Sequence, residues 1–404
     1  MRAPPADVDV AIVGAGIVGL AVARELRRRH PKLRLAVLER EGRIAAHQTS
    51  HNSGVIHAGI YYAPGSMKAR LCVEGASALY RFCDDHEVSV RRDGKLIVAR
   101  DESELPALEE LERRGRANRV PALRRLGTEE LAEIEPHCRG VAALHSPATG
   151  VVDFAAVARA LADDLREHDV RVYTGCGVRA TRARPASLSL RHSKGETSAR
   201  FAVFCAGAWA DLLAIQAGAD PDPRIVPFRG AYMLLRPERR ELVRSLIYPV
   251  PDAGLPFLGT HLTRHVDGQV SLGPTAVLAL GRDAYRPSRV RPRDLAATLA
   301  WPGSWRLFRR WWRTGVTEIR QALSIRAMVR AAATYVPELR PDDFERGFAG
   351  VRGQALGRDG KLVDDFVFSE TERALHVRNA PSPAATSALA IARLIAERAE
   401  PGLR

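Results

Sequence analysis

A glycine-rich turn between two apolar, β-like runs constrains this chain more than any other feature of its sequence. Gly14, Gly16 and Gly19 form a G-x-G-x-x-G pattern that follows the run at residues 8–13 and opens a stretch of helical apolar spacing. The first glycine permits a sharp turn, the second lets a pyrophosphate touch the backbone, and the third lets helix and strand pack closely. Glu39 closes the next apolar run, where a carboxylate can bind a ribose hydroxyl. The pattern predicts a strand–turn–helix–strand unit that binds an adenine dinucleotide; a glycine turn without a ligand is the alternative.

Length and composition indicate an ordinary globular protein. The chain has 404 residues, enough for two domains or one large interleaved pair, with 46% apolar and 27% charged residues. No apolar run is long enough to span a membrane, and the short polar stretch at residues 1–7 is not typical of a signal peptide. The five cysteines are scattered without a C-x-x-C. We therefore expect reduced thiols, a cytoplasmic location and no metal site.

The net charge of +14 is carried mostly by arginine. Nucleic acid, an anionic membrane and acidic substrates are all partners that a basic protein can select. The basic residues are spread along the chain, and no nucleic-acid-binding motif accompanies them. We expect no nucleic-acid partner.

The chain divides into regions of different character. Residues 225–277 hold short β-like runs separated by Gly and Pro, which are typical of an antiparallel sheet. Residues 292–324 are helical and aromatic, and residues 382–399 have the spacing of a final amphipathic helix. We predict an α/β fold, α+β overall, in which a mostly antiparallel β substrate domain is inserted into a Rossmann-like domain. The expected boundaries are 1–90, 140–220 and 340–404 for the Rossmann-like domain, and 91–139 and 221–339 for the substrate domain.

The cofactor that this arrangement favours is FAD. Only one G-x-G-x-x-G is present, whereas a reductase with separate flavin and nicotinamide sites normally shows two. An N-terminal pattern in a long, discontinuous domain favours FAD over NAD. The stretch at residues 47–72, rich in Gly, Ser, Asn and His, suits a loop that lays backbone donors along a ligand. An apolar strand ending at Ala206 and Gly207, followed by Trp209, suggests a second place where backbone meets the cofactor, with a buried strand and turn as the alternative.

Several strings resemble one family. They are HNSGVIHAGIYYAPGSMKA (residues 51–69), VPFRGAY (226–232), the region 247–279, GVRGQALGRDGKLVDDF (350–366) and NAPSPAATSALAIA (379–392). Together they resemble the L-2-hydroxyglutarate oxidase/dehydrogenase family, within the FAD-dependent D-amino-acid-oxidase/glycerol-3-phosphate-dehydrogenase superfamily. The likeness covers nearly the whole chain. Ala231 stands where an acidic residue is usual, and Gly353 stands where alanine is usual.

The resemblance implies an activity. L-2-Hydroxyglutarate would be oxidised to 2-oxoglutarate, FAD would accept the hydride from C2, and electrons would pass to oxygen, a quinone or another carrier. A neighbouring interpretation is an FAD-dependent oxidase or dehydrogenase of another 2-hydroxy acid, an amino acid or glycerol 3-phosphate. An interpretation from another class is a flavin electron carrier without substrate turnover.

Such a reaction needs a base for the hydroxyl proton and cations for the two carboxylates. Among the twelve histidines, His57 is our preferred base, with His51 in the same loop and His261 as the other candidates. A histidine that only orders the loop is the alternative. We assign the following residues to the dicarboxylate substrate, with Arg264 as a weaker candidate: Arg229, Arg352, Tyr62, Thr260 and Lys68.

The cofactor site is expected to draw on the glycine turn, the 47–69 loop and the C-terminal NAPSPAATS string. Pro381 and Pro383 fit a helix start that Ser382 could cap, with the helix N-terminus facing the flavin. An ordinary capped C-terminal helix is the alternative. The residues assigned to FAD are Gly14, Gly16, Ile17, Val18, Gly19, Glu39, Arg40, Thr49, Ser50, Asn52, Ser53, Gly54, Val178, Ala206, Gly207, Trp209, Gly350, Asn379, Ser382, Pro383 and Ala384.

The stretch at residues 301–315 holds four of the five tryptophans. Its spacing predicts one helical face of Leu307, Phe308, Trp311 and Trp312, opposed by arginines. That composition suits a helix lying on an anionic membrane surface, where reduced flavin could meet a quinone. A packed aromatic helix or a subunit contact is the alternative. We accordingly allow for a peripheral position at the inner face of the cell membrane.

Overall fold

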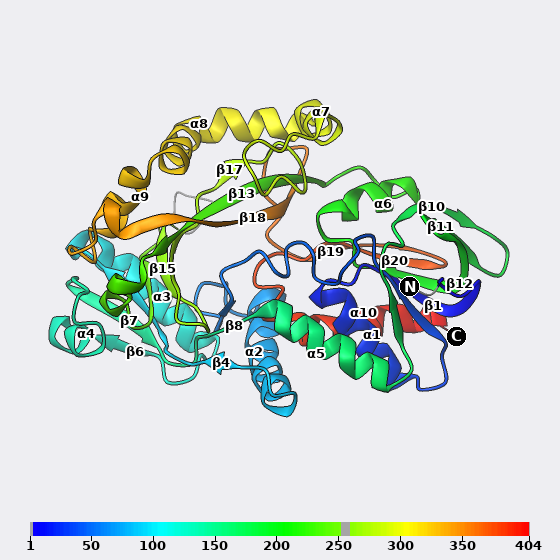
Figure 1. Cartoon of the computed structure of the whole chain (residues 1–404), viewed down its shortest axis with the longest axis horizontal. Helices are drawn as coiled ribbons and strands as arrows, with labels where there is room; N and C mark the ends of the chain where they lie inside the picture. The colour runs from blue at the N-terminus through cyan, green and yellow to red at the C-terminus, as the bar shows by residue number, and fades with distance from the viewer. Residues whose placement is uncertain (1–2, 252–258, 404) are drawn as a thin grey trace.

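The computed structural model describes residues 3–251 and 259–403, which form two bodies that the chain enters more than once (Figure 1). Over the described residues, one body contains an eight-stranded sheet and the other a nine-stranded sheet. Both chain ends lie in the first body. That body is therefore assembled from segments far apart in the sequence, as a discontinuous domain requires.

The eight-stranded sheet has a parallel centre. Its strands are β1 (Asp7–Val13), β2 (Leu35–Leu38), β9 (Arg171–Tyr173), β10 (Val178–Ala183), β11 (Leu188–His192), β12 (Gly195–Phe204), β19 (Val367–Thr371) and β20 (Ala374–Asn379). β1 lies between β2 and β12, parallel to both, and β9 and β20 extend the parallel part on either side. β10, β11 and β19 pair antiparallel at its margins. The predicted strand–turn–helix–strand unit thus stands at the centre of the sheet.

Helices cover one face of this sheet. They are α1 (Ile17–Arg29), α2 (Met67–Asp85), α5 (Phe154–Glu167) and α10 (Ala388–Leu403). Leu20, Leu161 and Ile395, one from each of three helices, are fully buried in a single cluster with Ile12 and Val37 of the sheet. The opposite face packs against the hairpin of β10 and β11 and against α6 (Ala210–Gln216). Apolar burial on both faces stabilises the parallel strands, as expected for an α/β layer.

The nine-stranded sheet is mostly antiparallel. Its strands are β5 (Lys95–Ala99), β6 (Arg124–Leu126), β7 (Ala142–Ser146), β13 (Arg224–Leu235), β14 (Leu246–Pro249), β15 (His261–Arg264), β16 (Val270–Gly273), β17 (Val277–Leu278) and β18 (Phe344–Leu356). β14 and β5 are its one parallel pair among the described strands. A small sheet of β3 (Val55–Ile56), β8 (Gly150–Val152) and β4 (Val90–Arg91) joins the 51–69 loop to this region.

The two faces of the nine-stranded sheet have different neighbours. The remaining helices are α3 (Leu105–Ala117), α4 (Thr128–Ile134), α7 (Pro292–Ala300), α8 (Pro302–Leu323) and α9 (Ile325–Ala332). Leu96 and Leu262 pack toward Met328 of α9. Ile97 and Tyr248 lie in a separate cluster with residues of the 51–69 loop and α3. Because successive strand residues point to opposite faces, Lys95 shares the face of Ile97, toward the loop.

The expected boundaries differ from the strand pairing at two places. We placed residues 140–149 and 340–356 in the Rossmann-like domain. β7 and β18, however, are strands of the nine-stranded sheet, since β7 pairs with β5 and β18 pairs along the length of β13. Part of the predicted β-like region, residues 252–258, lies outside the described residues.

The prediction of a helix from Ser382 is wrong. α10 begins at Ala388, and residues 381–387 form successive turns, with the Ala384 N–H donating to the Pro381 carbonyl and the Ser387 N–H to the Pro383 carbonyl. Ser382 therefore does not cap the helix. Two prolines within three residues remove backbone donors and delay the start of regular helix.

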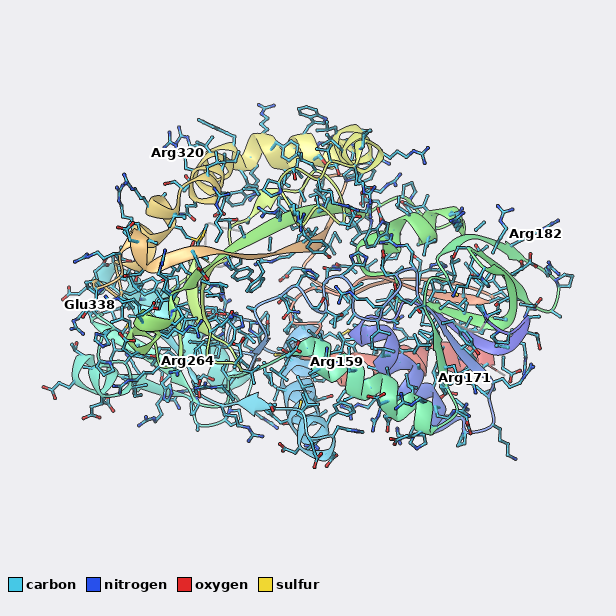
Figure 2. All side chains as sticks on the ribbon, viewed as in Figure 1. Arg159, Arg171, Arg182, Arg264, Arg320 and Glu338 are labelled. Atoms are coloured by element: carbon cyan, nitrogen blue, oxygen red, sulfur yellow. The ribbon has the colours of Figure 1, made fainter. Side chains whose placement is uncertain are left out.

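Exposed arginines occur on elements far apart in the fold. Arg159 on α5, Arg182 on β10 and Arg320 on α8 lie on widely separated parts of the molecule (Figure 2). Within the described ranges, no helix is both long and apolar enough to cross a bilayer.

Candidate functional site

A cavity of about 630 Å³ opens at the carboxyl ends of β1 and β12. Gly14 has φ +108°, and a Cβ there or at Gly19 would collide with a backbone carbonyl. A Cβ on Gly16, by contrast, would meet only the Thr49 hydroxyl, at 3.3 Å. The first and third glycines are thus needed for the turn and its packing, while the second leaves backbone open to a ligand.

The polar groups at the floor of this cavity are held by the backbone. The Glu39 carboxylate accepts the Ala15 N–H at 2.7 Å and the Glu41 N–H at 2.8 Å. The Thr49 hydroxyl accepts the Ile17 N–H at 3.1 Å, at the first turn of α1. Glu39 is therefore fixed at the end of β2, where a ribose hydroxyl is bound in dinucleotide folds.

The cavity collects most of the residues assigned to the cofactor. Its lining includes Gly14, Gly16, Ile17, Val18, Gly19, Glu39, Arg40, Thr49, Val178, Ala206, Gly207, Trp209, Asn379 and Ala384. The other assigned residues lie outside the lining: Ser50, Asn52, Ser53, Gly54, Gly350, Ser382 and Pro383. Gly350 and Gly54 still mark close packing. A Cβ on Gly350 would collide with the backbone of His51, and a Cβ on Gly54 would approach the backbone of Val152.

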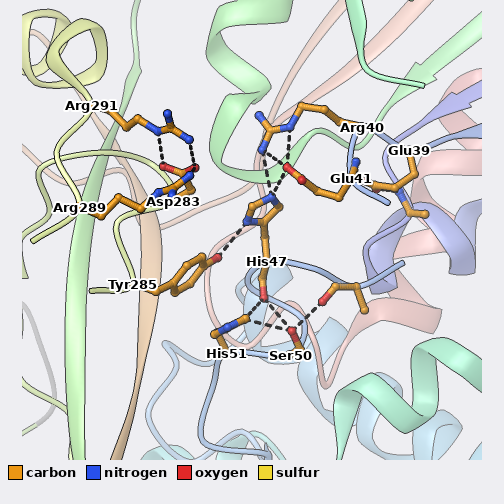
Figure 3. Close-up of polar contacts among 12 residues, drawn as sticks. Glu39, Arg40, Glu41, His47, Ser50, His51, Asp283, Tyr285, Arg289 and Arg291 are labelled. Atoms are coloured by element: carbon orange, nitrogen blue, oxygen red, sulfur yellow. Dashed lines mark hydrogen bonds and ion pairs between the residues drawn. The ribbon is translucent and has the colours of Figure 1, made fainter. Parts of the chain in front are cut away.

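A polar network fastens the 47–54 loop at the side of the cavity (Figure 3). The His47 ring lies 2.9 Å from the Glu41 carboxylate and 3.1 Å from the Tyr285 hydroxyl. His51 Nδ1 lies 2.9 Å from the His47 carbonyl, and its ring stacks on Tyr285 with centroids 4.1 Å apart. Burial lowers the pKa of His51. His51 thus belongs to a network that ties the loop to the segment carrying Asp283, Arg289 and Arg291.

A second cluster of titratable groups surrounds His57. Burial lowers the pKa of His57 well below its usual value, and the positive charge of Lys95 lowers it further. Burial likewise lowers the pKa of His261 to about 3, and Lys95 and Arg352 again act in the same direction. The His261 ring stacks on Tyr248 with centroids 3.8 Å apart, and its Nδ1 lies 2.9 Å from the Gly259 carbonyl. A protonated Nδ1 there leaves Nε2 as an acceptor.

Of the residues assigned to substrate, Arg352 reaches this cluster. It lies close enough to lower the pKa of His261 and contacts the Tyr232 hydroxyl, which also contacts Ser53 of the loop. Lys68 and Tyr62 lie at its margin, where Lys68 pairs with Asp364 at 2.5 Å and sits 5.0 Å from the Tyr62 ring centroid.

The other assigned groups have partners elsewhere. Arg229 Nε donates to the Tyr285 carbonyl at 2.9 Å, beside the His47 network. The Thr260 hydroxyl donates to Gln321 of α8 at 3.2 Å. Arg264 Nη1 reaches the Val243 carbonyl at 3.5 Å. These three are therefore engaged within the protein.

Sequence reasoning missed several residues of both regions. In the cavity these include His47, Gln48 and Gly353, whose N–H donates to the Gln48 amide oxygen at 3.1 Å. In the His57 cluster they are Lys95, Tyr61 and Tyr248. Lys95 opens an otherwise apolar strand, K-L-I-V-A, and no local feature of the sequence distinguishes it from a lysine at a strand end in solvent.

The structure also describes the two departures from the family pattern. A Cβ on Gly353 would lie 2.9 Å from Ile225 Cγ2 and 3.3 Å from Ala208 Cα, so glycine relieves crowding at the cavity wall. Ala231 is buried in β13, and its N–H donates to the Thr275 hydroxyl at 3.1 Å. An acidic side chain at that position would need its own partner.

Comparison with known proteins identifies the family. Residues 9–398 match the family model described as FAD dependent oxidoreductase. The chain belongs to the FAD-dependent oxidoreductase family. Within this family, it is similar to proteins named L-2-hydroxyglutarate dehydrogenase. The sea anemone Nematostella vectensis protein is 47% identical over 98% of this chain and 91% of the relative. The human protein is 45% identical over 98% of this chain and 90% of the relative. The Indibacter alkaliphilus protein is 42% identical over 97% of this chain and 98% of the relative.

Solved structures of the FAD-dependent oxidoreductase family share this fold. L-alpha-glycerophosphate oxidase from Mycoplasma pneumoniae, with FAD bound, matches with a TM-score of 0.78 at 24% identity, over 96% of this chain and 93% of that one. Glycine oxidase from Geobacillus kaustophilus matches with a TM-score of 0.73 at 19% identity, over 98% of this chain and 95% of that one. FAD is the cofactor of the family, and the glycine turn, the buried Glu39 and the 630 Å³ cavity fit its adenine, ribose and pyrophosphate.

Proposed function

We propose that this chain oxidises L-2-hydroxyglutarate to 2-oxoglutarate, with the hydride from C2 passing to FAD. Bound FAD supplies the hydride acceptor. The observation that carries the proposal is the cluster of His57, His261, Arg352 and Lys95, which combines neutral imidazoles with two buried or half-buried cations. A dianionic 2-hydroxy acid needs that combination, and the named relatives act on this substrate.

In this proposal His57 accepts the proton of the substrate hydroxyl. Its Nδ1 is buried and has no hydrogen-bond partner among the described residues, so a ligand hydroxyl can supply one. The low pKa of His57 keeps the imidazole neutral at physiological pH, and a neutral ring can accept a proton. The charge of a bound dianion would raise that pKa and favour proton transfer. Arg352 would hold a carboxylate through its planar guanidinium.

Anaerobic mixing of the FAD-loaded enzyme with L-2-hydroxyglutarate tests the proposal. We expect the yellow flavin absorbance to bleach. Bleaching with glycerol 3-phosphate, glycine or sarcosine but not with L-2-hydroxyglutarate would assign a different substrate. No bleaching with any of these compounds would favour a flavin electron carrier.

We propose oxygen, a quinone or another carrier as the electron acceptor, and a cytoplasmic enzyme with a peripheral contact at the inner face of the membrane. An exposed apolar stripe on α8 supports the membrane contact. Its residues are Trp305, Trp312, Val316, Ile319 and Leu323, which are 60%, 60%, 42%, 52% and 80% exposed. Exposed arginines border the stripe at Arg306, Arg309, Arg313 and Arg320, a pairing that suits an anionic lipid surface.

A further inference from the structure

Lys95 is the fully buried cation of the cluster around His57. It is the first residue of β5 and is only 1% exposed. Its ammonium lies 4.1 Å from the Tyr248 ring centroid and 5.1 Å from that of Tyr61. Tyr248 is on β14 and faces the 51–69 loop, and Tyr61 belongs to that loop. The lysine therefore points into the space between the sheet and the loop that carries His57.

No carboxylate within the described parts of the chain pairs with this ammonium. No hydrogen bond or ion pair to its Nζ is found among those residues, and the two aromatic faces are its principal contacts. Burial lowers the pKa of Lys95 to about 7. Cation–π contacts are worth about 0.5–2 kcal/mol, less than the several kcal/mol that desolvation of an ion costs. A fold that retains such a group leaves it available to an anion from outside.

The surroundings of Lys95 contain other polar atoms without partners. The Tyr61 hydroxyl and His57 Nδ1 are both buried and have no hydrogen-bond partner among the residues described. The ammonium lies over one ring, Tyr248, that in turn stacks on His261, and the charge of Lys95 lowers the pKa of both His261 and His57. A single ligand with an anionic end and a hydroxyl group would satisfy these atoms together.

Arg352 and Lys95 approach this space from different strands. Arg352 is on β18, at the far side of β13, and contacts Tyr232, which reaches Ser53 of the cofactor loop. Lys95 is on β5, with β14, β15 and β16 between it and β13. His261 responds to the charge of both. The carboxylate next to the reacting C2 must lie near the cofactor loop and hence near Arg352, which leaves the other carboxylate to Lys95.

Taking the proposed function as its basis, we propose that Lys95 binds the distal carboxylate of the substrate and selects a dicarboxylic over a monocarboxylic 2-hydroxy acid. Binding requires the charged ammonium, which the carboxylate itself stabilises. The rings of Tyr61 and Tyr248 flank the ammonium and exclude water from the pair. This role differs from that of a base, which would affect the chemical step for every 2-hydroxy acid.

The test compares L-2-hydroxyglutarate with L-2-hydroxyvalerate, which carries a methyl group in place of the distal carboxylate. The variants are Lys95→Met and Lys95→Arg in the FAD-loaded enzyme, with the exposed Lys194→Met as control. We expect Lys95→Met to lower kcat/KM for L-2-hydroxyglutarate by about 100-fold or more, through KM, as for removal of one partner of a buried charge pair. We expect kcat/KM for L-2-hydroxyvalerate to stay the same or rise. Lys95→Arg should recover part of the preference for the dicarboxylate, and Lys194→Met should change neither value.

A binding measurement covers the case in which L-2-hydroxyvalerate turns over too slowly to measure. Lys95→Met should weaken the binding of 2-oxoglutarate, measured as a shift of the flavin spectrum. It should leave the binding of 2-oxovalerate unchanged. Equal losses for both compounds, or no loss for either, would overturn the role of Lys95. A loss in kcat alone for both substrates would indicate a base instead and would also overturn it. If the wild-type enzyme reduces no flavin with L-2-hydroxyglutarate, the proposed function itself fails, which is a separate result.

Discussion

Burial of Lys95 lowers the free energy of unfolding, and the size of this destabilisation depends on pH. Its pKa falls from 10.5 to about 7 on burial. Between these values the unfolded chain holds a proton that the folded chain does not, so the Lys95 contribution to stability rises with pH across this window. The folded state bears the full cost of a charged, buried ammonium below pH 7.

We therefore predict that Lys95→Met raises the melting temperature of the ligand-free, FAD-loaded enzyme at pH 6. The rise should correspond to a gain of about 1–4 kcal/mol in the free energy of unfolding, because an apolar side chain of similar volume replaces an unpaired ion. This gain in stability should shrink as pH rises toward 10. Differential scanning calorimetry at several pH values measures it, with Lys194→Met as control. A gain that is constant with pH, or a loss at pH 6, would contradict the buried, unpaired state of Lys95.

His57 gives a second prediction at the level of a residue. Replacement of His57 by Ala should slow anaerobic flavin reduction by about 100- to 10,000-fold, as for the loss of a general base. FAD should remain bound, because His57 is not among the residues that line the cofactor cavity. Stopped-flow absorbance measures the rate, and His137→Ala, on the far side of the nine-stranded sheet, serves as control. A His57→Ala enzyme that reduces flavin at the wild-type rate would transfer the role to His261 or His51.

The glycine turn could be predicted from sequence because its requirements are local. Gly14, Gly16, Gly19 and Glu39 follow from the geometry of one turn and one helix start, and all four line the cavity. Lys95 could not be predicted, because its significance depends on Tyr61 and Tyr248, which approach it only through the packing of distant segments. A lone lysine before four apolar residues otherwise indicates a strand that begins in solvent.

At the scale of elements, α8 departs from the predicted pattern. We expected Leu307, Phe308, Trp311 and Trp312 on one face, and that prediction is wrong. Leu307 is 6% exposed and packs with Trp311 against Trp301 and Phe228, whereas Trp312 is 60% exposed. The backbone at Trp311 is not helical, with φ −116° and ψ 21°, and this kink turns neighbouring residues apart. The exposed apolar residues instead run from Trp305 and Trp312 to Leu323.

The stripe predicts binding to anionic lipid. The wild-type enzyme should sediment with phosphatidylglycerol vesicles. The double replacement Trp305→Ser and Trp312→Ser should weaken that binding by about tenfold or more, because the apolar surface of each tryptophan leaves water when the protein binds the vesicle. Sedimentation with neutral phosphatidylcholine should be weaker for both proteins.

The matched control replaces an exposed apolar residue outside α8. Val141 is 40% exposed, and Val141→Ser should sediment like the wild type. A wild-type protein that stays in the supernatant with anionic vesicles would refute the membrane contact. Equal sedimentation of wild type and the double tryptophan variant would refute the role of the stripe.

At the scale of the whole molecule, the sequence indicates both layers but not how the chain divides between them. The alternation of β-like and helical stretches predicted a parallel sheet with an antiparallel insert, and the fold agrees. The expected boundaries place β7 and β18 in the Rossmann-like domain, whereas both strands pair within the nine-stranded sheet. Such partners are set by non-local pairing, since β18 follows β13 after more than a hundred residues. Local periodicity carries no information on such partners.

The same long-range pairing brings the site together. His57 directly follows β3, whereas Lys95 comes from β5, His261 from β15 and Arg352 from β18. The cofactor cavity lies at the edge of the other sheet, and the loop at residues 47–57 runs from the cavity to the His57 cluster. In the proposed reaction, substrate and cofactor therefore meet where the two bodies meet.

A single-turnover experiment tests the central claim most directly. FAD-loaded enzyme is mixed anaerobically with L-2-hydroxyglutarate or with the same acid carrying deuterium at C2, and flavin absorbance and products are followed together. We predict one equivalent of 2-oxoglutarate for each flavin reduced, and slower bleaching with the deuterated substrate because the C2–H bond breaks in the step that reduces the flavin. Bleaching without 2-oxoglutarate, or no bleaching at all, would contradict the account.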